Sequence, residues 1–293
     1  MGRERRPLWL MLPGGILLLL VVGVPFALAA WMGFSGLDQY SLREWLQAPW
    51  VGLANFVEAL GSAGMPHALW LSVSFSLLTT VFAAPIGIVA ALTVNGRMRG
   101  RALVRSIYLV PYVIPQFVTA MLWRVMLQPD GAVNRALESL GLPAGQWLIG
   151  PNTFWTLVFV DVWASWAFIY MLTLAGLQTI PAEQYEAADM DGVTWWQKIR
   201  YVVLPQLRGP LSLALLLSTL HHFNNFTLPF VLFGTPAPEA VSVLPIAIYQ
   251  ISFQVFRFGL GAAMSILSLV VVAVPAVLYL RSVGLIGRRD HEA

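Results

Sequence analysis

Six long apolar runs constrain this chain more than any other feature. They lie at roughly residues 8–34, 68–94, 102–126, 154–177, 211–233 and 260–280. A helix needs about 20 mostly apolar residues to cross the hydrocarbon of a bilayer. Backbone N–H and C=O groups cannot stay unpaired in lipid, so each run is expected to be helical. The predicted fold class is therefore all-α, a polytopic membrane protein with six transmembrane helices.

The composition supports this prediction. Charged residues make up 11% of the chain, whereas a soluble domain carries about 25%. The 293 residues leave little outside the runs, so we expect a single transmembrane domain over residues 1–293. The chain has no cysteine, which excludes disulfides and thiolate metal sites. Prolines inside the runs predict kinks. These prolines are Pro25, Pro85, Pro115, Pro229 and Pro275.

Basic residues cluster at both termini and in two of the connections between runs. They are Arg3, Arg5, Arg6, Arg97, Arg99, Arg101, Arg105, Lys198, Arg200, Arg208, Arg281, Arg288 and Arg289. Connections rich in arginine and lysine stay on the cytoplasmic side, so both termini are expected in the cytoplasm. A cleaved signal peptide ending near Ala29 is the alternative for the first run. That run is longer than the signal core of about 7–15 residues, so we favour a span.

The two long outer connections are rich in aromatic and small residues. The first contains Trp45, Trp50, Gly52, Leu53, Asn55 and Phe56, and the second contains Gly131, Asn134 and Trp147. An interfacial tryptophan belt and a docking surface for an external partner are both compatible with this composition. The connections are too short to capture a solute by themselves, so a capturing domain would have to be another chain.

Motifs for nucleotide hydrolysis or metal catalysis are missing from the sequence. The single lysine, Lys198, follows no glycine-rich run, so there is no phosphate-binding GxxxxGK[ST] loop. HExxH and GxSxG do not occur either. We therefore expect no enzymatic activity, no catalytic residue, no metal site and no cofactor in this chain. Any energy for transport would come from a partner or from an ion gradient.

The longest charged interruption between apolar runs extends from Glu186 to Pro205. Pro181 suits the first position of a helix, and residues 182–191 are good helix formers. Ala187 and Ala188 provide a surface of little bulk, to which another protein can come close. An ordinary amphipathic helix lying on the membrane is the alternative.

The second half of this stretch is expected to return the chain to the membrane. Gly192 allows a sharp turn. Trp195 and Trp196 follow as apolar anchors. Leu204 and Pro205 are expected to reset the chain direction before the next run.

The pattern of this stretch resembles the EAA loop of permease subunits of binding-protein-dependent ABC importers. The matching positions are Glu186, Ala187, Ala188, Gly192, Val202, Leu204 and Pro205. The family usually has isoleucine where Val202 stands. Further segments are similar to the carbohydrate-uptake branch, which includes maltose, glycerol-3-phosphate and multiple-sugar importers. They are residues 52–56, 105–115, 129–134, 174–181 and 258–263. Residues 223–226 resemble the first permease of the maltose type.

The resemblance implies a type I ABC importer permease fold in a bacterial or archaeal cell membrane. It implies that the chain forms half of a translocation path for a sugar or a related small polar solute. The implied partners are a second permease, two ATPase subunits that bind ATP and Mg, and an extracytoplasmic solute-binding protein, in membrane lipid and without nucleic acid. The loop at about 181–209 would couple to the ATPase. The implied coupling residues are Glu186, Ala187, Ala188, Asp191, Gly192, Leu204 and Pro205.

Polar residues at membrane depth are costly and point to function. His221, His222 and Asn225 lie near the middle of the fifth run, and Asp161 and Ser165 share a face of the fourth. Hydrogen bonding between packed helices is the alternative. Alignment with the maltose-type permease implies five solute-contacting positions. They are Ala164, Ser165, Phe168, His222 and Asn225.

Two further alternatives concern Asp161 and the class of protein. Asp161 and Arg124 both lie near outer helix ends, so they are candidates for an ion pair.

A gradient-driven secondary transporter is the alternative function, and that class usually shows inverted repeats and an intramembrane carboxylate relay. Only Asp161 is deep enough to serve such a relay, and no repeat is evident. A membrane scaffold without transport would leave the polar residues at membrane depth unexplained.

Overall fold

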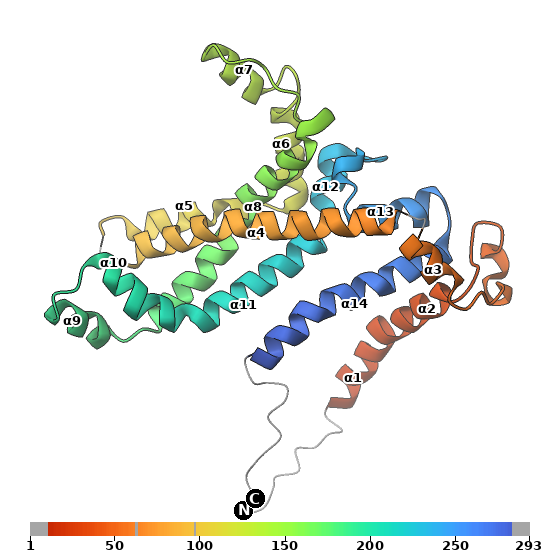
Figure 1. Ribbon diagram of the computed structural model, residues 1–293, viewed down its shortest axis with the longest axis horizontal. Helices are drawn as coiled ribbons and strands as arrows, with labels where there is room; N and C mark the ends of the chain where they lie inside the picture. Colours follow the sequence, from red (N-terminus) through yellow and green to blue (C-terminus); the bar gives the residue numbers. More distant parts are fainter. Residues whose placement is uncertain (1–10, 62–63, 97, 283–293) are drawn as a thin grey trace, which may run out of the picture. The chain divides into compact units, whose positions relative to one another are not determined.

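The computed structural model describes residues 11–61, 64–96 and 98–282, which form helices joined by loops (Figure 1). They fall into two compact units. The first unit contains the described parts of Met1–Pro66 and Ala247–Val270, and the second those of His67–Ile246 and Val271–Ala293. Several arginines behind the topology prediction lie outside the described residues. They are Arg3, Arg5, Arg6, Arg97, Arg288 and Arg289.

The first unit contains the first predicted span. Its elements are α1 (Leu12–Leu18), η2 (Leu19–Gly23), α2 (Val24–Gly33), η3 (Leu42–Gln47), α3 (Ala54–Gly61), η7 (Gln250–Gln254) and the first part of α14 (Phe258–Ser282). The first three form one helix from Leu12 to Gly33. The residues of η2 are wound as a π-helix. Pro25 lies two residues after η2 and has no N–H to donate to the Val21 carbonyl. The wider π-helical turn accommodates this missing bond, and the helix continues without a break.

Asn55 holds the end of α2 in the first unit. Its Nδ2 donates to the carbonyl oxygens of Gly33 at 3.0 Å and Ser35 at 2.8 Å. Carbonyls at a helix end have no donor within the helix, so the buried amide replaces that missing partner. Asn55 is one of the residues that the sequence analysis noted in the first outer connection. Its side chain therefore stabilises the fold of that connection.

An ion pair stabilises the same connection. Arg257 Nη2 donates to Glu58 Oε2 at 2.7 Å, which links α3 to the segment just before α14. The hydrogen bond from Arg257 holds the pKa of Glu58 below its usual value. Both side chains are partly exposed.

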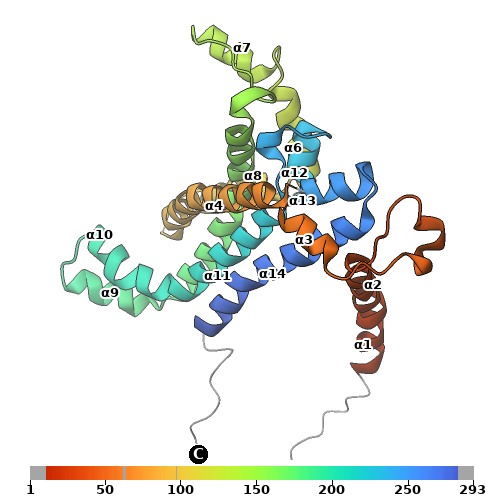
Figure 2. The ribbon, with the colours of Figure 1, turned by 45° about the vertical axis from the view of Figure 1, so that its right-hand side comes forward.

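The second unit contains the helices that lie wholly or mainly within residues 67–246. They are α4 (Met65–Asn95), α5 (Arg101–Val113), α6 (Gln116–Met126), α7 (Ala132–Ser139), η4 (Gly150–Asn152), α8 (Thr153–Gln178), α9 (Ala182–Met190), α10 (Trp195–Lys198), η5 (Ile199–Val203), α11 (Leu204–Phe223), α12 (Thr227–Phe233), η6 (Glu239–Val241) and α13 (Leu244–Tyr249). Of these, α4 and α13 extend a few residues across the unit boundary, and the last part of α14 also belongs to this unit. In Figures 1 and 2, α9 and α10 lie side by side at one end of the unit, and α6 and α7 lie at another.

The central helix of the second unit is α8, which packs against α5 and α11 and is buried along much of its length. It also lies against α4. A Cβ atom at Gly87 would lie 2.7 Å from the carbonyl oxygen of Trp166 and 2.8 Å from the amide of Tyr170. Only glycine permits this backbone approach, which is how small residues let membrane helices pack closely. α4 stays one helix despite Pro85.

The third predicted span is not one helix. α5 and α6 are bent by 86° at a short break. Ile114 has an extended backbone, with φ −68° and ψ 126°, because the ring of Pro115 disfavours the α conformation in the residue before it. Counting the bent pair as one span, the described residues contain up to six helical spans, five of them single helices.

The fifth predicted span has different limits from those expected. One helix runs from Trp195 to Phe223, and α12 begins at Thr227 after a short break. The predicted reset at Leu204 and Pro205 is wrong, because both residues lie within the continuous helix. Pro205 cannot donate a backbone hydrogen bond, and the π-helical turn η5 just before it absorbs the mismatch.

Asn134 organises the second outer connection. Its Nδ2 donates to the carbonyls of Pro129 at 3.0 Å and Gly145 at 3.1 Å. Its Oδ1 accepts from the Gly145 amide at 2.9 Å and from Trp147 Nε1 at 2.8 Å. Trp147 therefore serves the fold of its own loop. Whether the exposed aromatic residues of these connections meet lipid or a partner stays a prediction.

Candidate functional site

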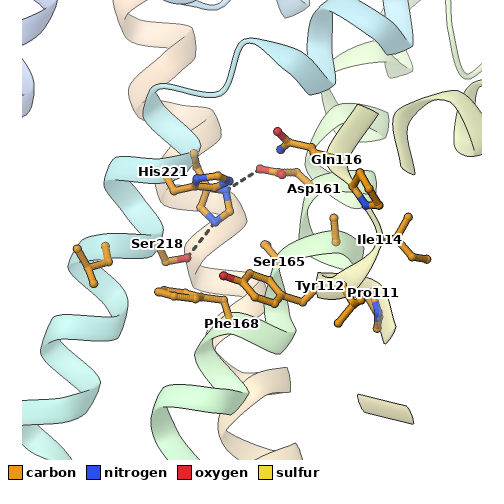
Figure 3. Close-up of a pocket in the computed structure, with 14 residues that line it drawn as sticks. Pro111, Tyr112, Ile114, Gln116, Asp161, Ser165, Phe168, Ser218 and His221 are labelled. Carbon is orange, nitrogen blue, oxygen red and sulfur yellow. Dashed lines mark hydrogen bonds and ion pairs between the residues drawn. The ribbon is translucent and has the colours of Figure 1, made fainter. Parts of the chain in front are cut away.

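A cavity of about 600 Å³ lies in the second unit, between the α5–α6 break, α8 and α11 (Figure 3). Its wall combines aromatic and polar side chains from all three places. Prominent among them are Tyr112, Gln116, Ser165, Phe168, Ser218 and His222. The rings of Tyr112 and Phe168 lie 5.9 Å apart at 31°. Apolar walls with a few polar groups are typical of small-molecule sites.

A buried polar chain crosses from α8 to α11 at the cavity wall. His222 Nδ1 lies 2.7 Å from Asp161 Oδ2, and His222 Nε2 lies 3.0 Å from Ser218 Oγ. The Asp161 and His222 side chains are 1% and 0% exposed. A buried carboxylate is costly unless it is paired, so His222 stabilises Asp161 where it stands.

Asn225 extends this chain to the start of α12. Its Nδ2 donates to Asp161 Oδ1 at 3.2 Å, and its Oδ1 accepts from the amide of Leu228 at 3.2 Å. Amide N–H groups in the first turn of a helix need partners outside the helix. Asn225 supplies one, so it fixes the break between α11 and α12.

The structure places the five predicted solute-contacting residues in two groups. Ala164, Ser165, Phe168 and His222 line the cavity. Asn225 is buried behind the wall and holds Asp161. Their contact with a solute stays a prediction.

The predicted pairing of Asp161 with Arg124 is wrong. Asp161 meets His222 and Asn225 instead, and Arg124 Nη1 donates to the carbonyl of Val231 at 3.0 Å. Val231 belongs to α12, so Arg124 serves the contact between α6 and α12.

Sequence reasoning missed several residues of the wall. Ser218 lies one turn before His222 on α11, a spacing that was visible in the sequence. Gln116 directly follows Pro115, Tyr112 precedes it by three residues, and both line the cavity at the break between α5 and α6. The kink predicted at Pro115 marked this place in the third run, but it did not indicate that the neighbouring side chains face a cavity.

The order Ser218–His222–Asp161 matches the connectivity of a hydrolytic triad, but the geometry does not support hydrolysis. Ser218 is 2% exposed and lies within α11. Backbone N–H groups inside a helix are already bonded, so its neighbours offer no donors to an oxyanion. Among the residues that the structure describes, no cluster of three His, Cys, Asp or Glu side chains could hold a metal.

The predicted coupling loop is a helical hairpin. α9 begins after Pro181, which is its N-cap rather than its first residue. Gly192 has φ +69°, a conformation that residues with a Cβ rarely adopt. Thr194 and Gln197 then form a capping box that starts α10.

The hairpin docks on its own chain through part of the predicted motif. Ala188 is buried, and Tyr185 packs against the cluster that contains Val203 and Leu207. Burial raises the pKa of the Tyr185 phenol above its usual value. Lys198 pairs with Asp189, and Gln206 donates to Gln184.

Other parts of the motif face outward. The exposed residues are Glu186, Ala187, Met190, Asp191, Gly192, Trp195, Trp196, Leu204 and Pro205. Ala188 was predicted to lie on the same outer surface, but its small side chain serves internal packing instead. The outward surface combines carboxylates with exposed apolar side chains.

Comparison with known proteins gives consistent matches. The family model described as "binding-protein-dependent transport system inner membrane component" matches residues 83–289. The trehalose/maltose transport system permease protein MalF of Thermococcus litoralis is 33% identical over 240 residues, covering 80% of both chains.

Two solved structures share the fold over most of their length. One is a bacterial ABC transporter involved in the import of the acidic polysaccharide alginate, with TM-score 0.82, 25% identity and 95% of both chains covered. The other is a bacterial alginate ABC transporter in complex with an alginate pentasaccharide-bound periplasmic protein. It has TM-score 0.79 and 25% identity, with 92% of this chain and 90% of that chain covered.

Proposed function

The chain belongs to the family of binding-protein-dependent transport system inner membrane components. We propose that its cavity carries the cargo and that its α9–α10 hairpin couples to an ATPase. The chain is a transmembrane subunit of an ABC importer and a multi-pass membrane protein. Family membership disfavours the gradient-driven secondary transporter considered from the sequence.

The proposed cargo is a sugar or a related small polar solute that passes through the cavity. The wall places Tyr112 and Phe168 rings near Ser165, His221 and Gln116. Ring faces can stack on a sugar, and hydroxyl and amide groups can bond to its hydroxyls. The relatives that transport trehalose or maltose and alginate support this class of cargo. Ala164 and His222 complete the wall, with Asn225 as its support.

The proposed coupling site is the outward surface of the α9–α10 hairpin. Glu186 and Asp191 would meet basic groups of an ATPase subunit, and exposed Ala187 would permit close approach. Gly192 sets the turn that orients this surface. ATP and Mg would bind to the ATPase, not to this chain.

The wider assembly is also part of the proposal. A second permease would complete the path, two ATPase subunits would power it, and a periplasmic solute-binding protein would deliver the cargo. The last of these is supported by the solved alginate transporter in complex with its periplasmic protein. Six spans with both termini in the cytoplasm would place the hairpin on the ATPase side.

One observation carries the proposal: the helix that starts at the hairpin ends at the cavity wall. It runs from Trp195 to Phe223 without a break and carries Ser218 and His222. A helix is stiff over this length, at about 1.5 Å per residue. Motion of the hairpin would therefore move the cavity wall with it.

The test is co-purification of ATPase activity with the assembled importer. Glu186→Lys and Gly192→Val should each reduce co-purified ATP hydrolysis at least tenfold, because the first reverses a charge and the second forces a Cβ into a positive φ. Glu183→Lys, an exposed carboxylate one turn earlier on α9, is the matched control. Full ATPase activity in both motif variants, with normal membrane insertion, would refute the coupling role.

A further inference from the structure

A second cavity, of about 280 Å³, lies in the second unit between α5 and the last turns of α8. It shares no lining residue with the first cavity. Arg105 and Gln178 line it near the start of α5 and the end of α8. The cavity is apolar further along both helices, where its lining residues are Leu109, Tyr170, Met171, Leu174 and Ala175. One end of the cavity is therefore polar and the rest is mostly apolar.

Two arginines at the polar end have no counter-ion. Arg101 and Arg105 are four residues apart on α5 and so lie on one face of it. Arg105 Nη2 donates to the carbonyl of Val94, near the end of α4, at 3.2 Å. The Nε atoms of both arginines are buried and have no hydrogen-bond partner among the described residues. No carboxylate of those residues pairs with either guanidinium. A buried charge is costly unless an opposite charge pairs with it, so an anion would stabilise this place.

Tyr170 is an independent sign of a ligand at the same cavity. It lines the cavity and is 1% exposed, and its hydroxyl has no hydrogen-bond partner among the described residues. Its ring packs edge-on against Tyr108, with 5.5 Å between the centroids, which fixes its position. Arg101 and Arg105 both lie close enough to act on the phenol electrostatically. The hydroxyl and the two guanidinium groups can all donate, so together they suit the oxygen atoms of an anion.

The helix ends around the cavity do not oppose an anion. α8 ends at Gln178 and places the negative end of its dipole there, whereas α5 begins at Arg101 without a side-chain cap and places its positive end there. Each end carries about half a unit charge, so the two largely cancel. The full charges of the two arginines remain, and they decide the sign of the ligand.

The apolar wall indicates where the anion comes from. A free phosphate ion would use only the polar end of the cavity. A phospholipid would use both parts, with its phosphate at the arginines and an acyl chain along Leu109, Met171 and Leu174. Met171 is 39% exposed, so this wall continues to the outside of the helices. Basic pockets between transmembrane helices bind anionic lipid headgroups, and a lipid is therefore the occupant that fits both parts.

We propose that Arg101, Arg105 and Tyr170 form a binding site for the phosphate of an anionic phospholipid, whose acyl chain covers the apolar wall. The guanidinium groups provide charge-assisted hydrogen bonds to the phosphate. The site is separate from the cargo cavity and depends neither on the cargo nor on the ATPase. Val94, which Arg105 contacts, belongs to the buried cluster against which Tyr185 of α9 packs. The bound lipid therefore lies beside the contacts that hold the hairpin.

The test measures lipid binding to the full chain in detergent by native mass spectrometry. Phosphatidylglycerol and phosphatidylcholine with the same acyl chains are titrated against it, because they differ in net charge and not in the length of the apolar part. The double variant Arg101→Gln with Arg105→Gln removes both charges. Arg99→Gln is the matched control, since Arg99 is an exposed arginine of the same connection.

Phosphatidylglycerol should bind about tenfold more tightly than phosphatidylcholine, because the two arginines attract its net negative charge. The double variant should bind both lipids equally, and Arg99→Gln should keep the preference. Tyr170→Phe should bind phosphatidylglycerol several-fold more weakly while its ring packing stays intact. Arg101→Gln alone keeps the bond from Arg105 to Val94, so it tests the site even if the double variant does not fold. It should lose part of the preference.

Equal binding of the two lipids by the unsubstituted chain would overturn the site, as would an unchanged preference in Arg101→Gln. A loss in Arg99→Gln as large as that in Arg101→Gln would assign the preference to general surface charge. Release of the lipid by millimolar inorganic phosphate would identify a site for a free anion instead. Absence of phosphatidylglycerol from the assembled importer, extracted with its lipids, would show that a carboxylate of a partner fills the site.

Discussion

Asp161 holds together the buried polar side chains at the cavity wall. Its two oxygens meet Asn225 and His222, and His222 in turn meets Ser218. These contacts join α8, α11 and the break before α12. The polarity of each residue was visible in the sequence, as was the shared face of Asp161 and Ser165. The pairing was not, because Asp161 and Asn225 are 64 residues apart and only the helix packing brings them together.

The first prediction concerns this carboxylate. Asp161→Ala should destabilise the purified chain by about 3–5 kcal/mol, because it removes one partner of a buried pair and leaves the other uncompensated. Asp161→Asn should cost clearly less, since its amide oxygen can still accept from His222. Thermal unfolding in detergent, followed by circular dichroism, measures both. If the two variants unfold at the same temperature, the carboxylate does not support His222 in this way.

Among the elements, the bent pair α5–α6 departs most from the sequence prediction. Five prolines were expected to kink the spans, yet α4 and α14 stay continuous through Pro85 and Pro275. Pro115 differs in having a second proline, Pro111, four residues before it. Two successive turns lose a backbone bond, and Ile114 leaves the helical conformation. The proline spacing was readable from the sequence, but the 86° angle depends on packing against neighbouring helices.

The second prediction concerns the ion pair between Glu58 of α3 and Arg257, which lies just before α14. The pKa of Glu58 is held below its ordinary value of 4.5. Its ion pair with Arg257 therefore contributes stability above pH 4.5 that is lost as the pH falls through the lower, folded value. The protection of the α3 amides against hydrogen exchange, taken relative to the intrinsic exchange rate at each pH, should therefore fall as Glu58 becomes protonated.

The test variant for this ion pair is Glu58→Gln, and its matched control is Glu44→Gln. Glu58→Gln should show lower protection of the α3 amides already at neutral pH and little further change in that protection with acid. Glu44→Gln, in the exposed η3 of the same connection, should behave as the unsubstituted chain does. An unchanged acid response in Glu58→Gln would assign the effect to another carboxylate.

For the whole molecule, hydropathy and motif spacing together predicted both the class and the family. The long apolar runs predicted helical spans, and the pattern from Glu186 to Pro205 indicated an importer permease, which the family match confirms. What the sequence could not provide was how the motif divides between surface and interior. Ala187 faces out and Ala188 faces in, because the fold of the hairpin, not the residue type, decides which alanine is buried.

The third prediction follows from the chain being one subunit of a driven importer. The chain purified alone should show no ATP hydrolysis, because it has no phosphate-binding loop. Co-expressed with its ATPase, it should retain hydrolysis through purification, and a cargo-loaded solute-binding protein should stimulate the rate several-fold. Phosphate release in proteoliposomes measures this. Solute uptake that persists without ATP, driven by a proton or sodium gradient, would contradict it.

The hairpin from Pro181 to Lys198 has a consequence for exchange between transporters. Its turn, its capping box and its Asp189–Lys198 pair all lie within the segment itself. From outside the segment, the cluster that contains Val203 and Leu207 packs against Tyr185, and Gln206 donates to Gln184. The segment therefore carries most of the contacts that shape its turn, and its last turn continues into the helix that reaches Phe223. Under the proposed coupling, a chimaera that receives another permease's hairpin could acquire that permease's ATPase while keeping its own cargo. Motor choice and cargo choice would then be free to evolve separately.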